Sequence, residues 1–218
     1  MNGRTLWRSV PPALVALPWI VVTPAAAHTI RPGVGAWLDG AARLALEPTD
    51  LLLAIALVLL ADQQGNSTLI RVRALLPVTW LVGAIAGLAV PVFFLLGPFA
   101  GGFYLLLNPF STGLFTVFAL LVSLRVPVPS RLLLVLVVLS AAAFGLVKGS
   151  LLGGHDAALP LLFAEGISLA AVVWLMAAVL EHLRFGWRTI AVRVVGSWIA
   201  AAGLLMLGWQ LRGGQGAG

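Results

Sequence analysis

The sequence contains no cysteine, which excludes disulfide bonds, thiolate metal sites, iron–sulfur clusters and cysteine nucleophiles. It also has little charge, because Asp, Glu, Lys and Arg make up only 9% of the 218 residues, against roughly 25% in soluble globular proteins. The charges are uneven in sign, with seven acidic against thirteen basic residues, and Lys148 is the single lysine. Any bound metal ion would therefore need imidazole, carboxylate or carbonyl ligands.

What the sequence has in excess is apolar residues, at 61% of the chain with a mean hydropathy of +1.08. These residues gather in runs close to the roughly 20 residues that a helix needs to cross a bilayer. The connections between the runs are too short to fold alone. We therefore predict one all-α domain, a polytopic membrane bundle of about six transmembrane helices over 28–218. The expected spans are about 44–61, 74–96, 99–122, 132–152, 157–180 and 194–211.

The first 27 residues have the pattern of a secretory signal peptide. Arg4 and Arg8 form a basic start, a short apolar stretch follows, and Ala25 and Ala27 supply an A-x-A cleavage pattern. Cleavage would leave His28 at the mature N-terminus, outside the cytoplasm. The alternative is an uncleaved first helix, although the apolar stretch is short and contains three prolines.

The arginines test this topology independently, because basic residues concentrate in the cytoplasmic connections of membrane proteins. With the mature N-terminus outside, residues 62–73, 123–131 and 181–193 are cytoplasmic. These segments carry seven arginines and the outer segments carry two. We thus expect a protein of the bacterial cytoplasmic membrane, with the lipid bilayer and not nucleic acid as its partner. The inner arginines are Arg71, Arg73, Arg125, Arg131, Arg184, Arg188 and Arg193, and the outer ones are Arg31 and Arg212.

Charged residues within the apolar runs are the candidates for function, because each costs at least a few kcal/mol in the bilayer. Before the first run, Asp39, Arg43 and Glu47 repeat every four residues and Asp50 follows three later, so all four share one face if a helix continues through Pro48. The alternative for Asp39 and Arg43 is an interfacial helix with internal ion pairs. Asp50 is expected to face the bundle.

Two further charges lie inside later runs. Lys148 stands near the outer end of the fourth span, and Glu165 is one or two turns into the fifth, beside Gly166. In the predicted topology Asp50, Lys148 and Glu165 all occupy the outer half of the bilayer, so we expect Lys148 to pair with one of the two carboxylates. The alternative is that the Lys148 side chain reaches to the interface without a partner.

A second candidate site, for a metal ion, lies on the outer segments. His28, His155 and Asp156, together with Asp50, could supply imidazole and carboxylate ligands, although histidines on loops are often only solvated. The sequence has no HExxH, GxSxG, P-loop or dinucleotide-binding pattern. We therefore expect neither an enzyme nor a cofactor.

Several stretches together resemble the HupE/UreJ family. They are Ala26-Ala27-His28-Thr29, the run 48–55 that begins Pro48-Thr49-Asp50, and the segment 144–149. The resemblance implies a signal peptide, six membrane helices and a nickel or cobalt permease associated with hydrogenase or urease. Two motifs of that family supply its metal ligands, His-x5-Asp-His in the first span and Phe-His-Gly-x-x-His-Gly-x-Glu in the fourth.

This sequence departs from the family at those ligands. The two histidines of the first motif fall on Leu44 and Leu51, and Asp50 is retained. In the fourth span the match to the second motif requires the deletion of one residue. The first histidine of that motif is missing, and Lys148 stands at the second. The resemblance thus favours a permease for a metal ion or other small solute, with a degenerate metal site. The alternative is a non-transporting membrane subunit or assembly factor that retains the fold; the sequence indicates no oligomeric state.

Overall fold

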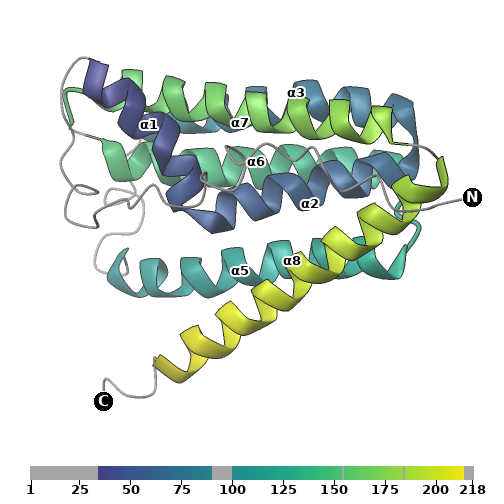
Figure 1. Ribbon diagram of the computed structural model, residues 1–218. Coiled ribbons are helices and arrows are strands. Elements are labelled where there is room, and N and C mark those ends of the chain that lie inside the picture. Colours follow the sequence, from purple (N-terminus) through teal and green to yellow (C-terminus); the bar gives the residue numbers. More distant parts are fainter. Residues whose placement is uncertain (1–33, 90–99, 154, 184, 214–218) are drawn as a thin grey trace, which may run out of the picture. The chain divides into compact units, whose positions relative to one another are not determined.

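The computed structural model describes residues 34–89, 100–153, 155–183 and 185–213, and these segments are almost entirely helical (Figure 1). The expected all-α class is confirmed, since the described residues contain no strand. The predicted signal peptide and His28 lie outside the described residues. The helices are α1 (Val34–Leu46), α2 (Pro48–Gln64), α3 (Asn66–Ala89), α5 (Ala100–Leu124), α6 (Ser130–Leu152), α7 (Ala158–His182) and α8 (Phe185–Gly213).

The expected count of six spans is wrong for the described part of the chain. Four helices there are long and apolar enough to cross a membrane: α3, α6, α7 and residues Gly186–Arg212 of α8. The bent pair α1 and α2 gives a fifth if it counts as one span. The apolar stretch Pro109–Leu124 of α5 is shorter than a span.

The first expected span is broken at Glu47, where the axes of α1 and α2 turn by 72°. Pro48 occupies the first turn of α2, where its missing N–H costs nothing, but it disfavours helical geometry in the residue before it. Glu47 accordingly has φ −106° and ψ 82°. The helix therefore does not continue through Pro48, and the four charges do not share one straight face. Arg43 and Glu47 still form an ion pair, with 3.5 Å between Nε and Oε1.

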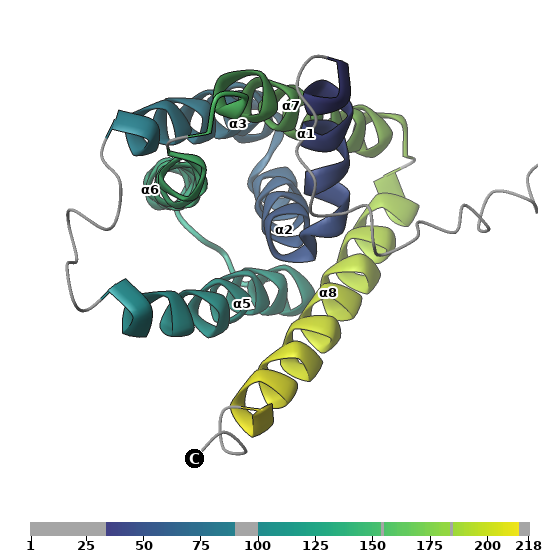
Figure 2. The ribbon, with the colours of Figure 1, turned by 90° about the vertical axis from the view of Figure 1, so that its left-hand side faces the viewer.

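Helix α2 lies at the centre of the bundle and contacts α3, α5, α6, α7 and α8 (Figure 2). Its residues from Ala56 to Ala61 are all buried, so the helix is covered on every side. A helix that is apolar all round is typical of such a position. Only its two ends carry buried carboxylates, Asp50 and Asp62.

Helices α3 and α6 approach closely through glycines. Gly83 and Gly87 of α3, and Gly145 and Gly149 of α6, each face the backbone of the other helix, and a Cβ built on any of them would overlap a carbonyl oxygen there. The four glycines form two reciprocal GxxxG motifs, the pattern that lets membrane helices pack at short range. Gly166 is different, because a Cβ there would make ordinary contacts of 3.5 Å with Trp80 and Leu81.

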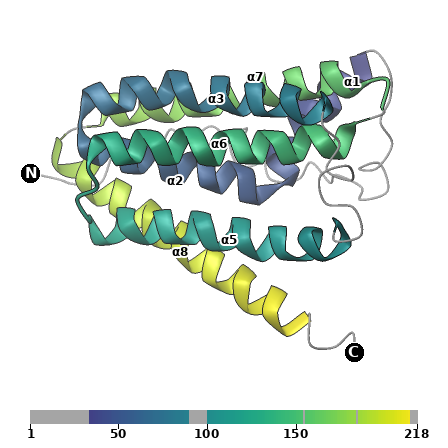
Figure 3. The ribbon, with the colours of Figure 1, turned by 180° about the vertical axis from the view of Figure 1, so that it is seen from behind.

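The three segments expected on the cytoplasmic side lie at one end of the bundle. In Figure 3 the α2–α3 and α5–α6 connections and the start of α8 are all on the left. Side chains join them: Gln63 Nε2 donates to the carbonyl oxygen of Val122 at 2.7 Å, and Arg193 Nε donates to that of Ser123 at 3.2 Å. The structure thus agrees with the prediction that these three segments lie on the same side of the protein.

Candidate functional site

The charged residues within the apolar helices meet at the opposite end of the bundle, around Lys148. The Lys148 Nζ lies 3.1 Å from Asp50 Oδ2 and 3.5 Å from Glu165 Oε1, and it also contacts Glu47 Oε2. The predicted pairing of Lys148 with Asp50 or Glu165 is confirmed, and it involves both. The alternative of an unpaired lysine at the interface is wrong, because only 8% of Lys148 is exposed.

Each charge is positioned by a local feature of the backbone. The bend at Pro48 places Glu47 and Asp50 on successive sides of the helix break. Lys148 stands between Gly145 and Gly149, the two residues that hold α6 against α3. Glu165 comes from the second turn of α7. Three helices (α2, α6 and α7) and the break at Glu47 thus supply the cluster.

The carboxylates are buried without good hydrogen bonds. Glu165 is fully buried, and neither of its carboxylate oxygens makes a hydrogen bond with a described residue. The Asp50 Oδ2 and Lys148 Nζ atoms lie at ion-pair distance, but at angles unsuited to a hydrogen bond. Asp50 Oδ1 accepts from Thr49 Oγ1 at 3.4 Å. Attraction between charges, more than directed bonds, holds this cluster together.

The charge count within the cluster leaves one negative charge unmatched. The ion pairs join three carboxylates (Glu47, Asp50 and Glu165) to two cations (Lys148 and Arg43). When all five are ionised, the excess is one negative charge, which a proton or a further cation would neutralise. A buried uncompensated charge is costly, so the cluster has a physical reason to take up one of these.

A pocket of about 340 Å³ lies against the cluster, and a second cavity of about 20 Å³ lies deeper. Asp50 and Phe144 line both, so they separate the pocket from the apolar interior. The pocket is open to the surroundings, because Phe110 and Leu151 at its edge are 65% and 49% exposed. Its lining is Glu47, Thr49, Asp50, Phe110, Ser111, Ala143, Phe144, Val147, Lys148 and Leu151.

The residues that could hold a metal ion are not the expected set. Among the described residues, Glu47, Asp50 and Glu165 form such a group, with ligand atoms within 4.8 Å of one another. His155 and Asp156 are exposed in the connection after α6 and do not join it, and His28 lies outside the described residues. Three carboxylates suit hard cations such as alkali and alkaline-earth ions, whereas nickel and cobalt favour imidazole. The Lys148 ammonium stands where such a cation would lie.

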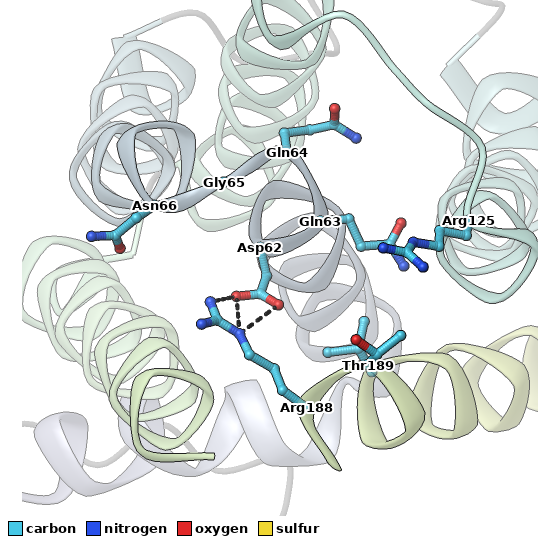
Figure 4. Close-up of a pocket in the computed structure, with 9 residues that line it drawn as sticks. Asp62, Gln63, Gln64, Gly65, Asn66, Arg125, Arg188 and Thr189 are labelled. Carbon is cyan, nitrogen blue, oxygen red and sulfur yellow. Dashed lines mark hydrogen bonds and ion pairs between the residues drawn. The ribbon is translucent and has the colours of Figure 1, made fainter. Parts of the chain in front are cut away.

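A second charged site, at the arginine-rich end, was missed by the sequence analysis. Arg188 of α8 forms a bidentate pair with Asp62 of α2, in which its Nε donates to Oδ1 at 3.0 Å and Oδ2 at 3.1 Å and its Nη2 also contacts Oδ1 (Figure 4). Nearby, Arg73 lies 3.7 Å from Glu181 and stacks over Trp174. One signal was available: Asp62 ends the apolar run that Asp50 begins, so both ends of a buried helix needed a counter-charge.

The sequence matches no protein-family model, and comparisons with curated proteins and with solved structures find no match either.

Proposed function

We propose that the protein is a permease for a small hard cation, in which the Lys148 ammonium occupies the cation site until the transported ion displaces it. The observation that carries the proposal is the position of Lys148 among three carboxylates, beside an open pocket. In the empty state the tethered ammonium and Arg43 together balance two of the three carboxylate charges. An incoming cation exchanges places with it at small cost, since one charge replaces another.

The ligand chemistry of the cluster limits which properties of the HupE/UreJ family we propose for this chain. Leu44 and Leu51 stand where that family has the histidines of its first motif, and Lys148 stands at the second histidine of the other motif. The three carboxylates beside Lys148 offer only oxygen ligands. We therefore propose a related layout with a changed substrate class, and no nickel or cobalt transport through this cluster.

The alternative function is a non-transporting membrane subunit or assembly factor. It is favoured by the same lysine, because a permanent ammonium among carboxylates can also be a purely structural substitute for a metal ion. The two functions differ in what added cations do. A structural cluster keeps Lys148 in place at any cation concentration, whereas the site of a permease releases it.

Transport is tested with the purified protein in proteoliposomes, using radioactive sodium, calcium and nickel as separate probes. We expect uptake of sodium or calcium, no uptake of nickel, and loss of uptake in Asp50→Asn. The matched control is Asp156→Asn, which removes an exposed carboxylate outside the cluster and should leave uptake unchanged. Absence of uptake of all three ions would contradict the permease, and nickel uptake would contradict the substrate class.

We further propose that residues 1–27 are a cleaved signal peptide and that the arginine-rich end faces the cytoplasm of a bacterial inner membrane. Because the chain has no cysteine, single cysteines report topology cleanly. An impermeant thiol reagent added to intact cells should label His155→Cys and spare Ser67→Cys and Ser130→Cys, all three being exposed positions. Labelling of the last two in intact cells would reverse the orientation.

A further inference from the structure

At the arginine-rich end, a pocket of about 390 Å³ is formed by three segments far apart in the sequence (Figure 4). The α2–α3 turn, the end of α5 and the first turns of α8 each contribute to it. Seven of its nine lining residues have polar side chains, against five of ten in the pocket beside Lys148. The lining residues are Asp62, Gln63, Gln64, Gly65, Asn66, Arg125, Arg188, Thr189 and Val192.

The charge of this pocket is positive. Asp62 balances the charge of Arg188, so the guanidinium of Arg125 supplies one excess positive charge. In Figure 4 the Arg125 side chain reaches inward from the end of α5 towards Gln63. Guanidinium groups present several N–H donors in one plane, an arrangement suited to the oxygens of a phosphate.

The backbone of Arg125 is held in an uncommon conformation. Its φ is 55°, in the left-handed region, and it is the first residue beyond α5. The Arg125 N–H donates to the Val122 carbonyl oxygen at 3.2 Å and the Val126 N–H to that of Leu121 at 3.0 Å. This is the Schellman pattern of a helix end, where glycine is the usual residue because it avoids the strain. An arginine at this position makes the folded protein less stable than a glycine would, but it places a charged side chain at the pocket.

The pocket also offers an acceptor. Gln63 is fixed by its Nε2, which donates to Val122, while its buried Oε1 accepts no hydrogen bond from the described residues. A ligand hydroxyl would satisfy that oxygen. The exposed Trp187 precedes Arg188, and tryptophan is enriched at the level of lipid headgroups. The pocket therefore combines a site for phosphate, an acceptor for a hydroxyl and a position at the membrane surface.

From these observations we infer that the pocket at Arg125 binds a phosphate group with a neighbouring hydroxyl, as in a phosphoglycerol. The source is an anionic phospholipid such as phosphatidylglycerol or a soluble phosphoglycerol. This inference concerns the end of the bundle opposite to Lys148 and stands whether or not the protein transports cations.

The test is the thermal unfolding of the purified full chain in detergent, titrated with phosphatidylglycerol, phosphatidylcholine or glycerol phosphate. A ligand that binds only the folded state raises the Tm, by an amount that grows with the logarithm of the ratio of its concentration to its Kd. We expect phosphatidylglycerol to raise the Tm and phosphatidylcholine not to. If glycerol phosphate alone raises it, the ligand is soluble. If none of the three does, the inference is wrong.

The decisive variant is Arg125→Gly, because it should change stability and binding in opposite directions. Without ligand its Tm should rise, since glycine relieves the left-handed strain, while its affinity for the phosphate ligand should fall at least tenfold. Arg125→Lys keeps the charge and should retain part of the affinity. Arg131→Gln removes an exposed arginine in the first turn of α6 that does not line the pocket, and this variant should bind as the unmodified protein does. If Arg125→Gly and Arg131→Gln lost the same amount of affinity, binding would depend only on the general surface charge, and the proposed site would be refuted.

Discussion

The variant Lys148→Met is expected to lose about 3–5 kcal/mol of unfolding free energy, the cost of removing one partner of a buried ion pair. Methionine has nearly the length of lysine, so packing changes little and the loss is electrostatic. It leaves Asp50 and the fully buried Glu165 without their shared cation. The measurement is unfolding of the purified protein in mixed micelles of mild and denaturing detergent.

The second variant of that experiment separates charge from packing. Lys148→Met combined with Glu165→Gln removes a cation and a carboxylate together, and should be more stable than Lys148→Met alone. Arg131→Met, which removes an exposed cation, serves as the control and should be near neutral. If the single Lys148 variant were as stable as the unmodified protein, or the double variant less stable than the single, the cluster would not be held by charge.

The second large effect is expected from Gly149→Ala, which should cost about 3 kcal/mol or more, at the upper end of the range for overpacked cores. The added Cβ would overlap the carbonyl oxygen of Ala84, and the carbonyl carbon of Ala84 would lie only 2.7 Å from the Cβ. These atoms are backbone, so no side-chain rotation relieves the overlap and α3 must move away from α6. Because Lys148 adjoins Gly149, the ion-pair cluster should be disturbed as well.

Gly113→Ala is the matched control, since no atom lies within 4 Å of a Cβ built there. Alanine favours the helix over glycine by about 1 kcal/mol, so this variant should be neutral or slightly more stable. Both variants are measured by the same detergent unfolding. Equal stability of Gly149→Ala and Gly113→Ala would mean that the close approach of α3 and α6 is not required.

Much of the fold could be predicted because the bilayer imposes simple rules. Apolar runs separated by short polar connections give helices, and a charged residue inside such a run needs a partner. That reasoning was enough to predict that Lys148 pairs with Asp50 or Glu165, and the structure shows it paired with both.

The features of the fold and site that could not be predicted from the sequence depend on how segments far apart in the chain are arranged. Pro48 is compatible both with a continuing helix and with a new one, so the 72° bend and the entry of Glu47 into the cluster were not foreseen. The count of six spans failed for a further reason, because the apolar stretch of α5 in the described residues covers only Pro109–Leu124. The pair of Asp62 with Arg188 joins residues 126 positions apart, and Arg188 had been used only as a topology marker.

The central claim, that the Lys148 ammonium is a displaceable occupant of the carboxylate cluster, can be measured on Lys148 itself because it is the only lysine. A small, uncharged acylating reagent that reacts with amines is added to the protein in detergent, with and without sodium or calcium. Acylation of Lys148 is followed by peptide mass spectrometry. At rest the buried ammonium should react slowly, since three carboxylates surround it. We predict that sodium or calcium speeds the modification of Lys148 several-fold, while choline at the same ionic strength does not. An acylation rate that is the same with and without either cation would contradict the account and leave Lys148 as a fixed structural counter-ion.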